Sequence, residues 1–241
     1  MKLRHCKDDE EISILFGLSS SSVGRVFKTW LNFLYFQLKE LDLWIDSETV
    51  KQHMPEQFKK LFPETRVIID ATEIPIEKPT NISDQSASFS TYKNRNTLKC
   101  LVGVAPRGLV TFVSEAYGGS ASDRQILERS ELLTKQNNFS RGESIMAVRG
   151  FLVQDLFATQ GVVLNVPTTM KGKNQLEPVT VVKDRRIASK RVHVERVIGF
   201  AKTYKILTQP LQHTYLSLGG RILTVCFAIS NFRVSIVKDY C

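Results

Sequence analysis

Two blocks of helical periodicity open the chain, and a short break separates them. Acidic residues at positions 8–11 suit the N-terminal end of a helix that we expect to run to Phe16. Gly17 can adopt the left-handed conformation that ends such a helix, and Ser19 or Ser20 can cap a second one. In the second helix, apolar residues recur at helical spacing: Val23, Val26, Phe27, Trp30, Leu31, Leu34 and Leu38. The pattern predicts a helix-turn-helix segment over residues 1–45.

The pattern then changes from helical to mixed. We interpret the polar stretch 46–64 as a helical connector. Over residues 65–237, strand-like runs cover 66–71, 98–104, 109–116, 144–148 and 162–166, and helical segments cover 120–133, 152–159 and 184–204. The tetrapeptide Ala105-Pro106-Arg107-Gly108 has β-turn chemistry and predicts a hairpin. A strand meander followed by alternating strands and helices predicts an α/β domain whose mixed sheet has helices on both faces.

Composition excludes several classes of protein. The longest apolar stretch, 221–237, contains Arg221, Asn231 and Arg233, so we expect a core helix there and no membrane span. The first five residues lack the apolar run of a secretory signal. The cysteines at positions 6, 100, 226 and 241 are scattered, which favours a reducing compartment over a disulfide framework or a structural zinc site.

Positive charge is concentrated in one segment. The formal net charge is +9, yet residues 1–45 carry six basic and six acidic side chains. Residues 171–205 carry ten basic and three acidic side chains. Such a basic segment fits a polyanion such as nucleic acid, and it equally fits a solvated surface.

Two carboxylates stand at positions where apolar residues surround them. Asp70 directly follows three apolar residues, and a buried unpaired carboxylate costs several kcal/mol, so it must be paired, capped or coordinated to a metal. Glu195 lies about 80° from Ile187 on a helical wheel, beside the stripe that Ile187 forms with Val194, Ile198 and Ala201. It can reach inward toward the sheet or pair with Arg191, four residues earlier.

Five motifs in order resemble one family. They are Asp70-Ala71-Thr72-Glu73-Ile74-Pro75-Ile76-Glu77-Lys78-Pro79, Tyr92-Lys93-Asn94-Arg95-Asn96-Thr97-Leu98-Lys99, Gly118-Gly119-Ser120-Ala121-Ser122-Asp123, Ala147-Val148-Arg149-Gly150-Phe151 and Arg191-Val192-His193-Val194-Glu195-Arg196. Together they resemble the DDE superfamily endonuclease domain of Harbinger-type transposases. Residues 11–30 resemble the helix-turn-helix segment that precedes this domain. The resemblance implies an RNase H-like fold, cut-and-paste DNA chemistry and a divalent metal, Mg²⁺ or Mn²⁺.

The resemblance also implies roles for single residues. Asp70 becomes the first catalytic and metal-binding carboxylate and Glu195 the third. The second aspartate should stand where Val148 does, within an otherwise intact motif. Valine offers no lone pair to a metal, so we expect impaired catalysis; Asp155 and Glu143 are the nearest substitutes, and neither has the motif's position. Asp123 matches another aspartate of the family, as a metal ligand or as part of a capping box with Ser120.

Partners follow from the same resemblance. DNA in the nucleus is the expected partner, and we expect an exposed basic surface near the carboxylates, formed by Lys183, Arg185, Arg186, Lys190 and Arg196. The family usually has a helix before Leu3, so we expect the helix-turn-helix segment to be truncated. A homodimer or a transposase accessory protein is a further partner to consider. The alternatives are a domesticated, non-catalytic module that uses the basic 171–205 surface for DNA or protein, and a pseudogene product without function.

Overall fold

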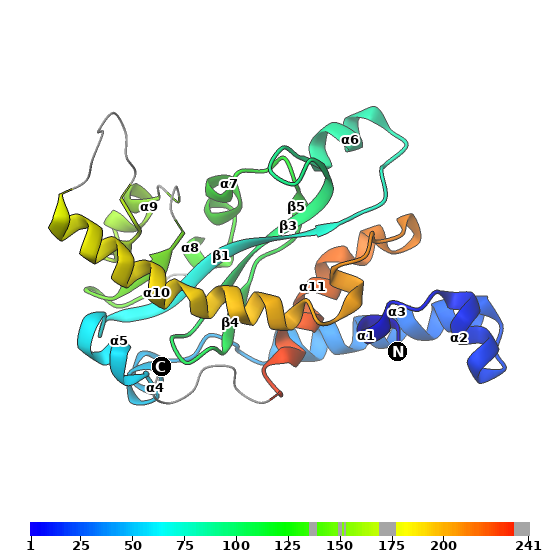
Figure 1. Ribbon diagram of the computed structural model, residues 1–241. Coiled ribbons are helices and arrows are strands. Elements are labelled where there is room, and N and C mark those ends of the chain that lie inside the picture. The colour runs from blue at the N-terminus through cyan, green and yellow to red at the C-terminus, as the bar shows by residue number, and fades with distance from the viewer. Residues whose placement is uncertain (135–138, 149–150, 152, 169–176, 234–241) are drawn as a thin grey trace.

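The computed structural model describes residues 1–134, 139–148, 151, 153–168 and 177–233 (Figure 1). Five helices precede the sheet: α1 (Lys2–His5), α2 (Asp9–Phe16), α3 (Ser20–Glu40), α4 (Ser47–Gln52) and α5 (Glu56–Leu61). Asp8 caps α2 by accepting the amide of Glu11, and Gly17 ends that helix at a φ of 62°. Ser19 then caps α3 by accepting the amide of Ser22. The predicted Ser19 cap and the glycine break are confirmed.

The expected amphipathic face of α3 is only partly buried. Val23, Leu31 and Leu38 are its buried residues, whereas Val26 and Trp30 are more than half exposed. The difference arises because α3 is covered on one side, where it contacts α11 (Gly219–Ser230) and α2. An apolar stripe on a helix is thus wider here than the face that packs.

A single sheet forms the centre of the molecule. Its strands are β1 (Thr65–Pro75), β2 (Phe89–Ser90), β3 (Arg95–Val104), β4 (Val110–Val113), β5 (Tyr117–Gly118), β6 (Ser144–Ala147) and β7 (Val163–Asn165). The order is β2-β3-β1-β6-β7, with β4 and β5 also paired to β3. β3 is antiparallel to β1, whereas β6 and β7 are parallel to it and to each other. The predicted mixed sheet is confirmed.

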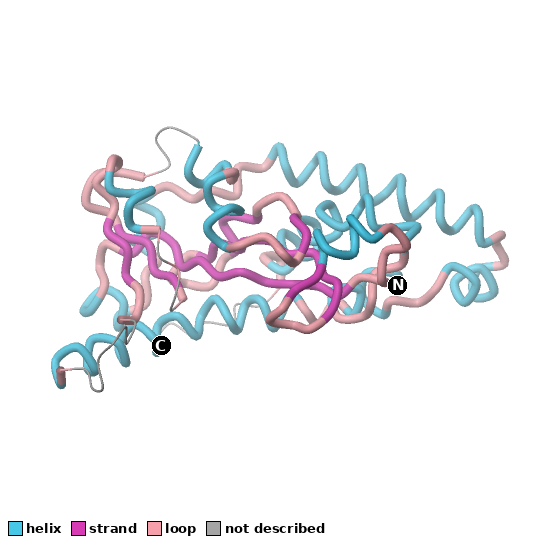
Figure 2. Tube along the Cα trace, turned by 90° about the horizontal axis from the view of Figure 1, so that it is seen from above, coloured by secondary structure: helices cyan, strands magenta, loops and turns pink. Residues whose placement is uncertain are grey.

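The remaining helices lie on both sides of the strands (Figure 2). They are α6 (Ile82–Ser88), α7 (Asp123–Glu128), α8 (Glu131–Thr134), α9 (Gln154–Ala158), α10 (Pro178–Ala201) and α11, with 3-10 turns η1 (Lys205–Leu207) and η2 (His213–Leu218). The helix expected over 120–133 is two shorter ones, because the Ser130 hydroxyl and amide both bond to the Leu127 carbonyl. α10 begins six residues before Asp184, with Pro178 at its favoured first-turn position.

Alternating residues of β1 pack into two hydrophobic cores. Ile68 and Ile74 join a cluster with α10 and α11, whereas Val67 and Ile69 join a cluster with α7, α8 and α9. Burying each such side chain contributes about 1.5–3 kcal/mol. This two-sided α/β arrangement is the RNase H-like fold, and it carries α10 across β1, β3 and β6 (Figure 1).

The end of the chain also follows the expected pattern. The buried residues Ile222, Leu223 and Phe227 of α11 belong to the core, as expected for a core helix. Positions 234–237 of that apolar stretch lie outside the described residues. In the part of the chain that the structure describes, none of the helices combines the length and apolarity that crossing a bilayer requires.

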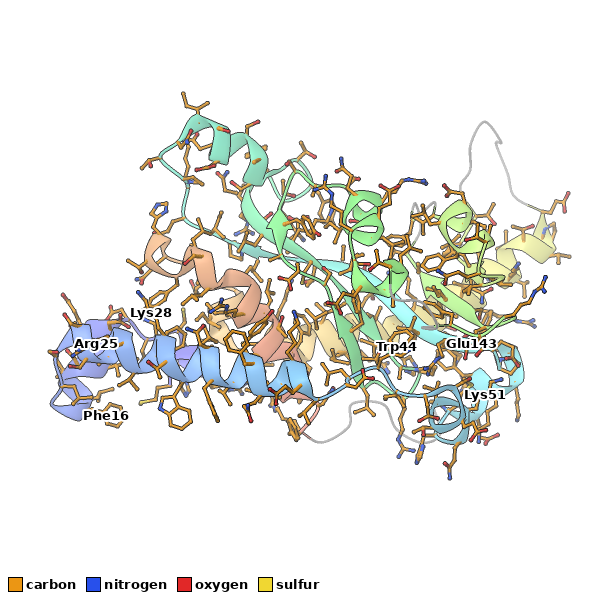
Figure 3. All side chains as sticks on the ribbon, turned by 180° about the vertical axis from the view of Figure 1, so that it is seen from behind. Phe16, Arg25, Lys28, Trp44, Lys51 and Glu143 are labelled. Atoms are coloured by element: carbon orange, nitrogen blue, oxygen red, sulfur yellow. The ribbon has the colours of Figure 1, made fainter. Side chains whose placement is uncertain are left out.

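Charged contacts attach the first helices to the rest of the molecule. Lys2 pairs with Asp9 at 2.7 Å, and the Tyr215 hydroxyl donates to the same carboxylate. Arg4 donates to the carbonyl and hydroxyl of Thr203. In Figure 3, Phe16 lies at the end of the molecule opposite the labelled Glu143. The helix-turn-helix segment is therefore anchored at α1, at the start of α2 and by the packing of α3 on α11, and its far end projects beyond the sheet.

Candidate carboxylate site

Asp70 lies in the centre of the sheet. It pairs with Val102 of β3, and its neighbour Ile69 pairs with Ala147 of β6. One carboxylate oxygen accepts the amide of Ala71 at 2.9 Å. Burial raises the pKa of Asp70 to about 6, Arg191 opposes the rise, and Glu195 and Asp123 add to it. The fold therefore brings three carboxylates into electrostatic contact, drawn from β1, α10 and α7.

Glu195 pairs with Arg191 and also lies near the sheet, so both alternatives for its side chain hold. It forms an ion pair with Arg191 at 2.8 Å, with its side chain about half exposed at 47%. It also acts on the pKa of Asp70, so it lies near the sheet as well. The expected core stripe is confirmed, because Ile187, Val194, Ile198 and Ala201 are all buried. Arg191 is thus the cation shared by both carboxylates.

Val148 follows directly on the last residue of β6. Because Ile69 and Ala147 are partners in the parallel register, Val148 is one residue along from Ala147 just as Asp70 is from Ile69. The half-buried Val148 side chain packs against the core cluster that contains Ile69 and Phe151. Arg149 and Gly150 of the same motif lie outside the described residues. An apolar residue thus ends the strand next to the one that carries Asp70, and its side chain packs with the Ile69 cluster.

The expected capping box between Ser120 and Asp123 is wrong. Ser122 caps α7 and forms the box with Gln125, while the Ser120 hydroxyl donates to the carbonyl of Ala87. The helix begins at Asp123 itself, so this carboxylate is left to make an ion pair with Lys99 at 2.7 Å. Asp123 stands beside the site as a carboxylate that already has a counter-ion.

Neither substitute carboxylate is available to the site. Glu143 is buried at the opposite end of β6, 3.4 Å from the guanidinium of Arg66, and it accepts the amide of Ser140 at 2.9 Å. Asp155 accepts two hydrogen bonds from Arg124, at 3.0 and 2.5 Å, and these hydrogen bonds are the main cause that lowers the pKa of Asp155. Both carboxylates are used structurally.

The donor set does not fit a two-metal centre. Within the described ranges, no three His, Cys, Asp or Glu side chains gather closely enough to hold a metal ion. Asp70 and Glu195 supply oxygen atoms, but Val148 supplies none, and the cations of Arg191 and Lys99 neutralise part of the carboxylate charge. Two cations that share a phosphate need bridging oxygen ligands, which these side chains do not complete.

Four of the five residues that we expected to form an exposed basic surface are exposed. Lys183, Arg185, Arg186 and Arg196 are exposed on α10. Lys190 is buried at 4% exposure, because its ammonium donates to Gln57 and lies 5.8 Å from the ring centre of Phe58. Periodicity within α10 could not reveal this contact, since α5 supplies both partners. The expectation of an exposed Lys190 is wrong.

Sequence reasoning also missed Lys202, directly after α10. Its half-buried ammonium donates to the Glu73 carbonyl at 3.2 Å. Burial lowers the pKa of Lys202, Lys93 lowers it further, and Cys100, Glu73 and Asp70 act in the opposite direction. The signal in the sequence was its position seven residues after Glu195, two helical turns along the same face.

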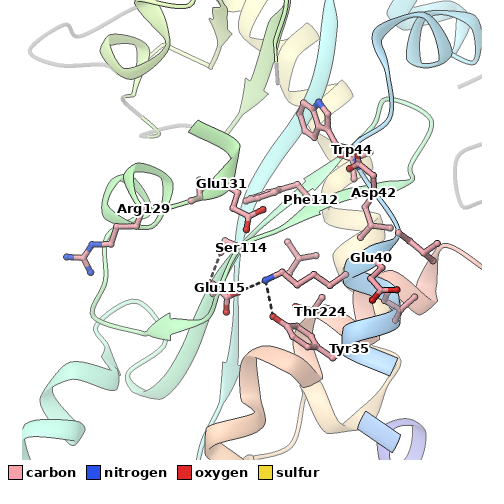
Figure 4. Close-up of a pocket in the computed structure, with 17 residues that line it drawn as sticks. Tyr35, Glu40, Asp42, Trp44, Phe112, Ser114, Glu115, Arg129, Glu131 and Thr224 are labelled. Carbon is pink, nitrogen blue, oxygen red and sulfur yellow. Dashed lines mark hydrogen bonds and ion pairs between the residues drawn. The ribbon is translucent and has the colours of Figure 1, made fainter. Parts of the chain in front are cut away.

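A separate cavity of about 250 Å³ lies between the end of α3, β4 and the α7–α8 region (Figure 4). Lys39 lies in it, 3.7 Å from Glu115 and 3.4 Å from the Tyr35 hydroxyl. The hydrogen bond with Tyr35 is the largest cause that raises the pKa of Lys39. None of the residues that line this cavity is Asp70, Asp123, Val148 or Glu195, so this cavity and the carboxylates are distinct places.

Comparison with known proteins assigns both parts of the chain. The helix-turn-helix of DDE superfamily endonuclease matches residues 1–40, and the DDE superfamily endonuclease family matches residues 69–231. No curated protein and no solved structure matches the chain significantly. The second match covers more than half of the 241 residues and includes Asp70, Val148 and Glu195. The chain therefore belongs to the DDE superfamily endonucleases.

Proposed function

We propose that this chain is a Harbinger-type transposase domain that binds DNA and whose nuclease activity is impaired at position 148. The observation that carries the proposal is Val148 at the end of β6, one residue past Ala147, the register partner of Ile69. Endonucleases of this superfamily generally use divalent metals, with Mg²⁺ or Mn²⁺ as the proposed ions. Losing one metal's contribution of several kcal/mol slows the reaction about a thousandfold or more.

The remaining chemistry supports binding without efficient cleavage. Asp70 and Glu195 provide two carboxylates, and Arg191 balances their charge. Four exposed cations on α10 provide the positive surface that a phosphate backbone requires. We further propose that the protein acts on DNA in the nucleus.

A nicking assay on supercoiled DNA tests the impaired step. The natural chain, Val148→Asp and the double variant Val148→Asp with Asp70→Asn are compared in Mg²⁺ and in Mn²⁺. We expect metal-dependent nicking from Val148→Asp alone, because only that variant has all three carboxylates. Equal nicking by the natural chain and by Val148→Asp would contradict the proposal.

The four exposed cations of α10 also favour a second function. A domesticated module would use the 171–205 segment for DNA or a protein partner and would have no need of the carboxylates. Under this alternative, Val148→Asp does not restore nicking, and DNA binding depends on Lys183, Arg185, Arg186 and Arg196. The same nicking assay, run beside a binding assay, separates the two functions.

A further inference from the structure

A second, basic cavity lies beside the carboxylates. Its volume is about 220 Å³, and it is lined by β1, the turn between β2 and β3, and the segment that follows α10. Its lining includes three cations and one carboxylate: Lys93, Arg95, Lys202 and Glu73. The excess of positive charge indicates an anionic ligand.

The turn that presents two of these cations is held firmly. Asn94 adopts a left-handed conformation at a φ of 51°, and the amide of Lys93 donates to the Ser90 hydroxyl at 3.2 Å. The Asn96 amide group donates to the Gln85 carbonyl and to the Ser88 hydroxyl, both at 2.8 Å. Exposed Lys93 and Arg95 therefore flank a fixed turn, and both side chains line the cavity.

The positive charges of this cavity are not neutralised by ion pairs with described residues. Across the described residues, no carboxylate forms an ion pair with Lys93, Arg95 or Lys202. The carboxylate of Glu73 instead accepts the hydroxyl of Thr97 at 2.8 Å. A cation without a carboxylate partner is free to neutralise a phosphate.

The cavity lies close to Asp70 along the strand. Glu73 follows Asp70 by three residues, which is about 10 Å of extended chain. Asp70 also acts electrostatically on Lys202, which agrees with the short separation.

We propose that Lys93, Arg95 and Lys202 bind a phosphodiester group of DNA close to the position of Asp70. The inference rests on the proposed DNA-binding function and adds a site outside the exposed surface of α10. It gives a role to the motif Tyr92–Lys99, which the carboxylate assignment left without one. The ligand is the phosphate, so the site positions DNA and does not read its sequence.

Charge-removing variants of the full chain test the site. Arg95→Gln and Lys93→Gln each remove one exposed cation, and Lys60→Gln is the matched control, since it removes an exposed lysine on α5. Binding to a duplex of 30 base pairs is measured by fluorescence anisotropy at several salt concentrations without divalent metal. We expect each test variant to bind about tenfold more weakly at low salt and to reduce the salt slope by about 0.9. The control should match the parent.

Each outcome supports or overturns the inference. Equal affinity and salt slope in Arg95→Gln, Lys93→Gln and Lys60→Gln would overturn it, while leaving the proposed DNA binding intact. A parent chain that binds no DNA at any salt concentration would overturn both. Inorganic phosphate that binds the parent and not Arg95→Gln, at constant ionic strength, and leaves DNA affinity unchanged would identify a free-phosphate site and reject the DNA assignment. Loss of binding in the two variants, without nicking by Val148→Asp, would support the cavity and contradict the impaired-nuclease proposal.

Discussion

The two ends of the β1–β6 strand pair differ in how their charged side chains are paired. At the first end, Arg66 and Glu143 lie within 3.4 Å of each other and are both almost completely buried, with Arg66 5.0 Å from the ring centre of Trp44. At the other end, Asp70 shares its surroundings with Glu195 and Asp123, and the pKa of Asp70 rises to about 6. At the first end, opposite charges neutralise each other inside the fold. At the other end, neighbouring carboxylates make the ionisation of Asp70 less favourable, and such raised pKa values are common at functional sites.

Removing one partner of the buried Arg66–Glu143 ion pair should have the largest effect on stability. Glu143→Gln leaves the buried Arg66 without its carboxylate, and removing one partner of a buried pair costs about 3–5 kcal/mol. The free energy of unfolding in urea measures this loss. The double variant Arg66→Met with Glu143→Leu should recover most of it, because no charge remains buried. A loss below about 1 kcal/mol for Glu143→Gln would show that solvent reaches Arg66.

Adding a carboxylate at the other end should have a smaller, metal-dependent effect. Val148→Asp places a third carboxyl group near Asp70 and Glu195, which should cost about 2–3 kcal/mol without metal. Millimolar Mg²⁺ or Mn²⁺ should raise the melting temperature of this variant, because ligand binding to the folded state stabilises it. The parent should barely respond. Equal responses would mean that position 148 does not face the carboxylates, or that the parent already binds metal fully.

Removing the charge of Asp70 should have the smallest effect, and its sign depends on pH. The pKa of Asp70 is about 6 in the folded chain, above its ordinary 3.8, so the folded state holds the proton more tightly. The resulting stability is complete below about pH 4 and is lost as pH rises through 6. Asp70→Asn should therefore be more stable than the parent by about 1–2 kcal/mol at pH 7, after screening. Unfolding in urea at pH 4 and pH 7 tests this, and an equal pH slope in both proteins would contradict it.

Local signals in the sequence were interpreted correctly because their partners lie nearby. Asp8 and Ser19 accept amides three residues later, and Gly108 closes the predicted turn by donating to the carbonyl of Ala105. The alternation of Val67, Ile68 and Ile69 between two cores follows from the two-residue period of a strand. The capping residue of α7 was misplaced, since Ser120 and Ser122 both precede an acidic or amide side chain at capping-box spacing.

The sequence by itself determined the RNase H-like class, the helix-turn-helix segment and the motif in which Val148 replaces an aspartate. Tertiary structure alone decided which partner each of these charged side chains has: Lys190 is buried against Gln57, Asp123 pairs with Lys99, and Glu143 pairs with Arg66. The physical reason is distance along the chain. Caps and turns are fixed within about four residues, whereas these pairs join residues 24 to 133 positions apart, where only the packing of helices on the sheet selects the partner.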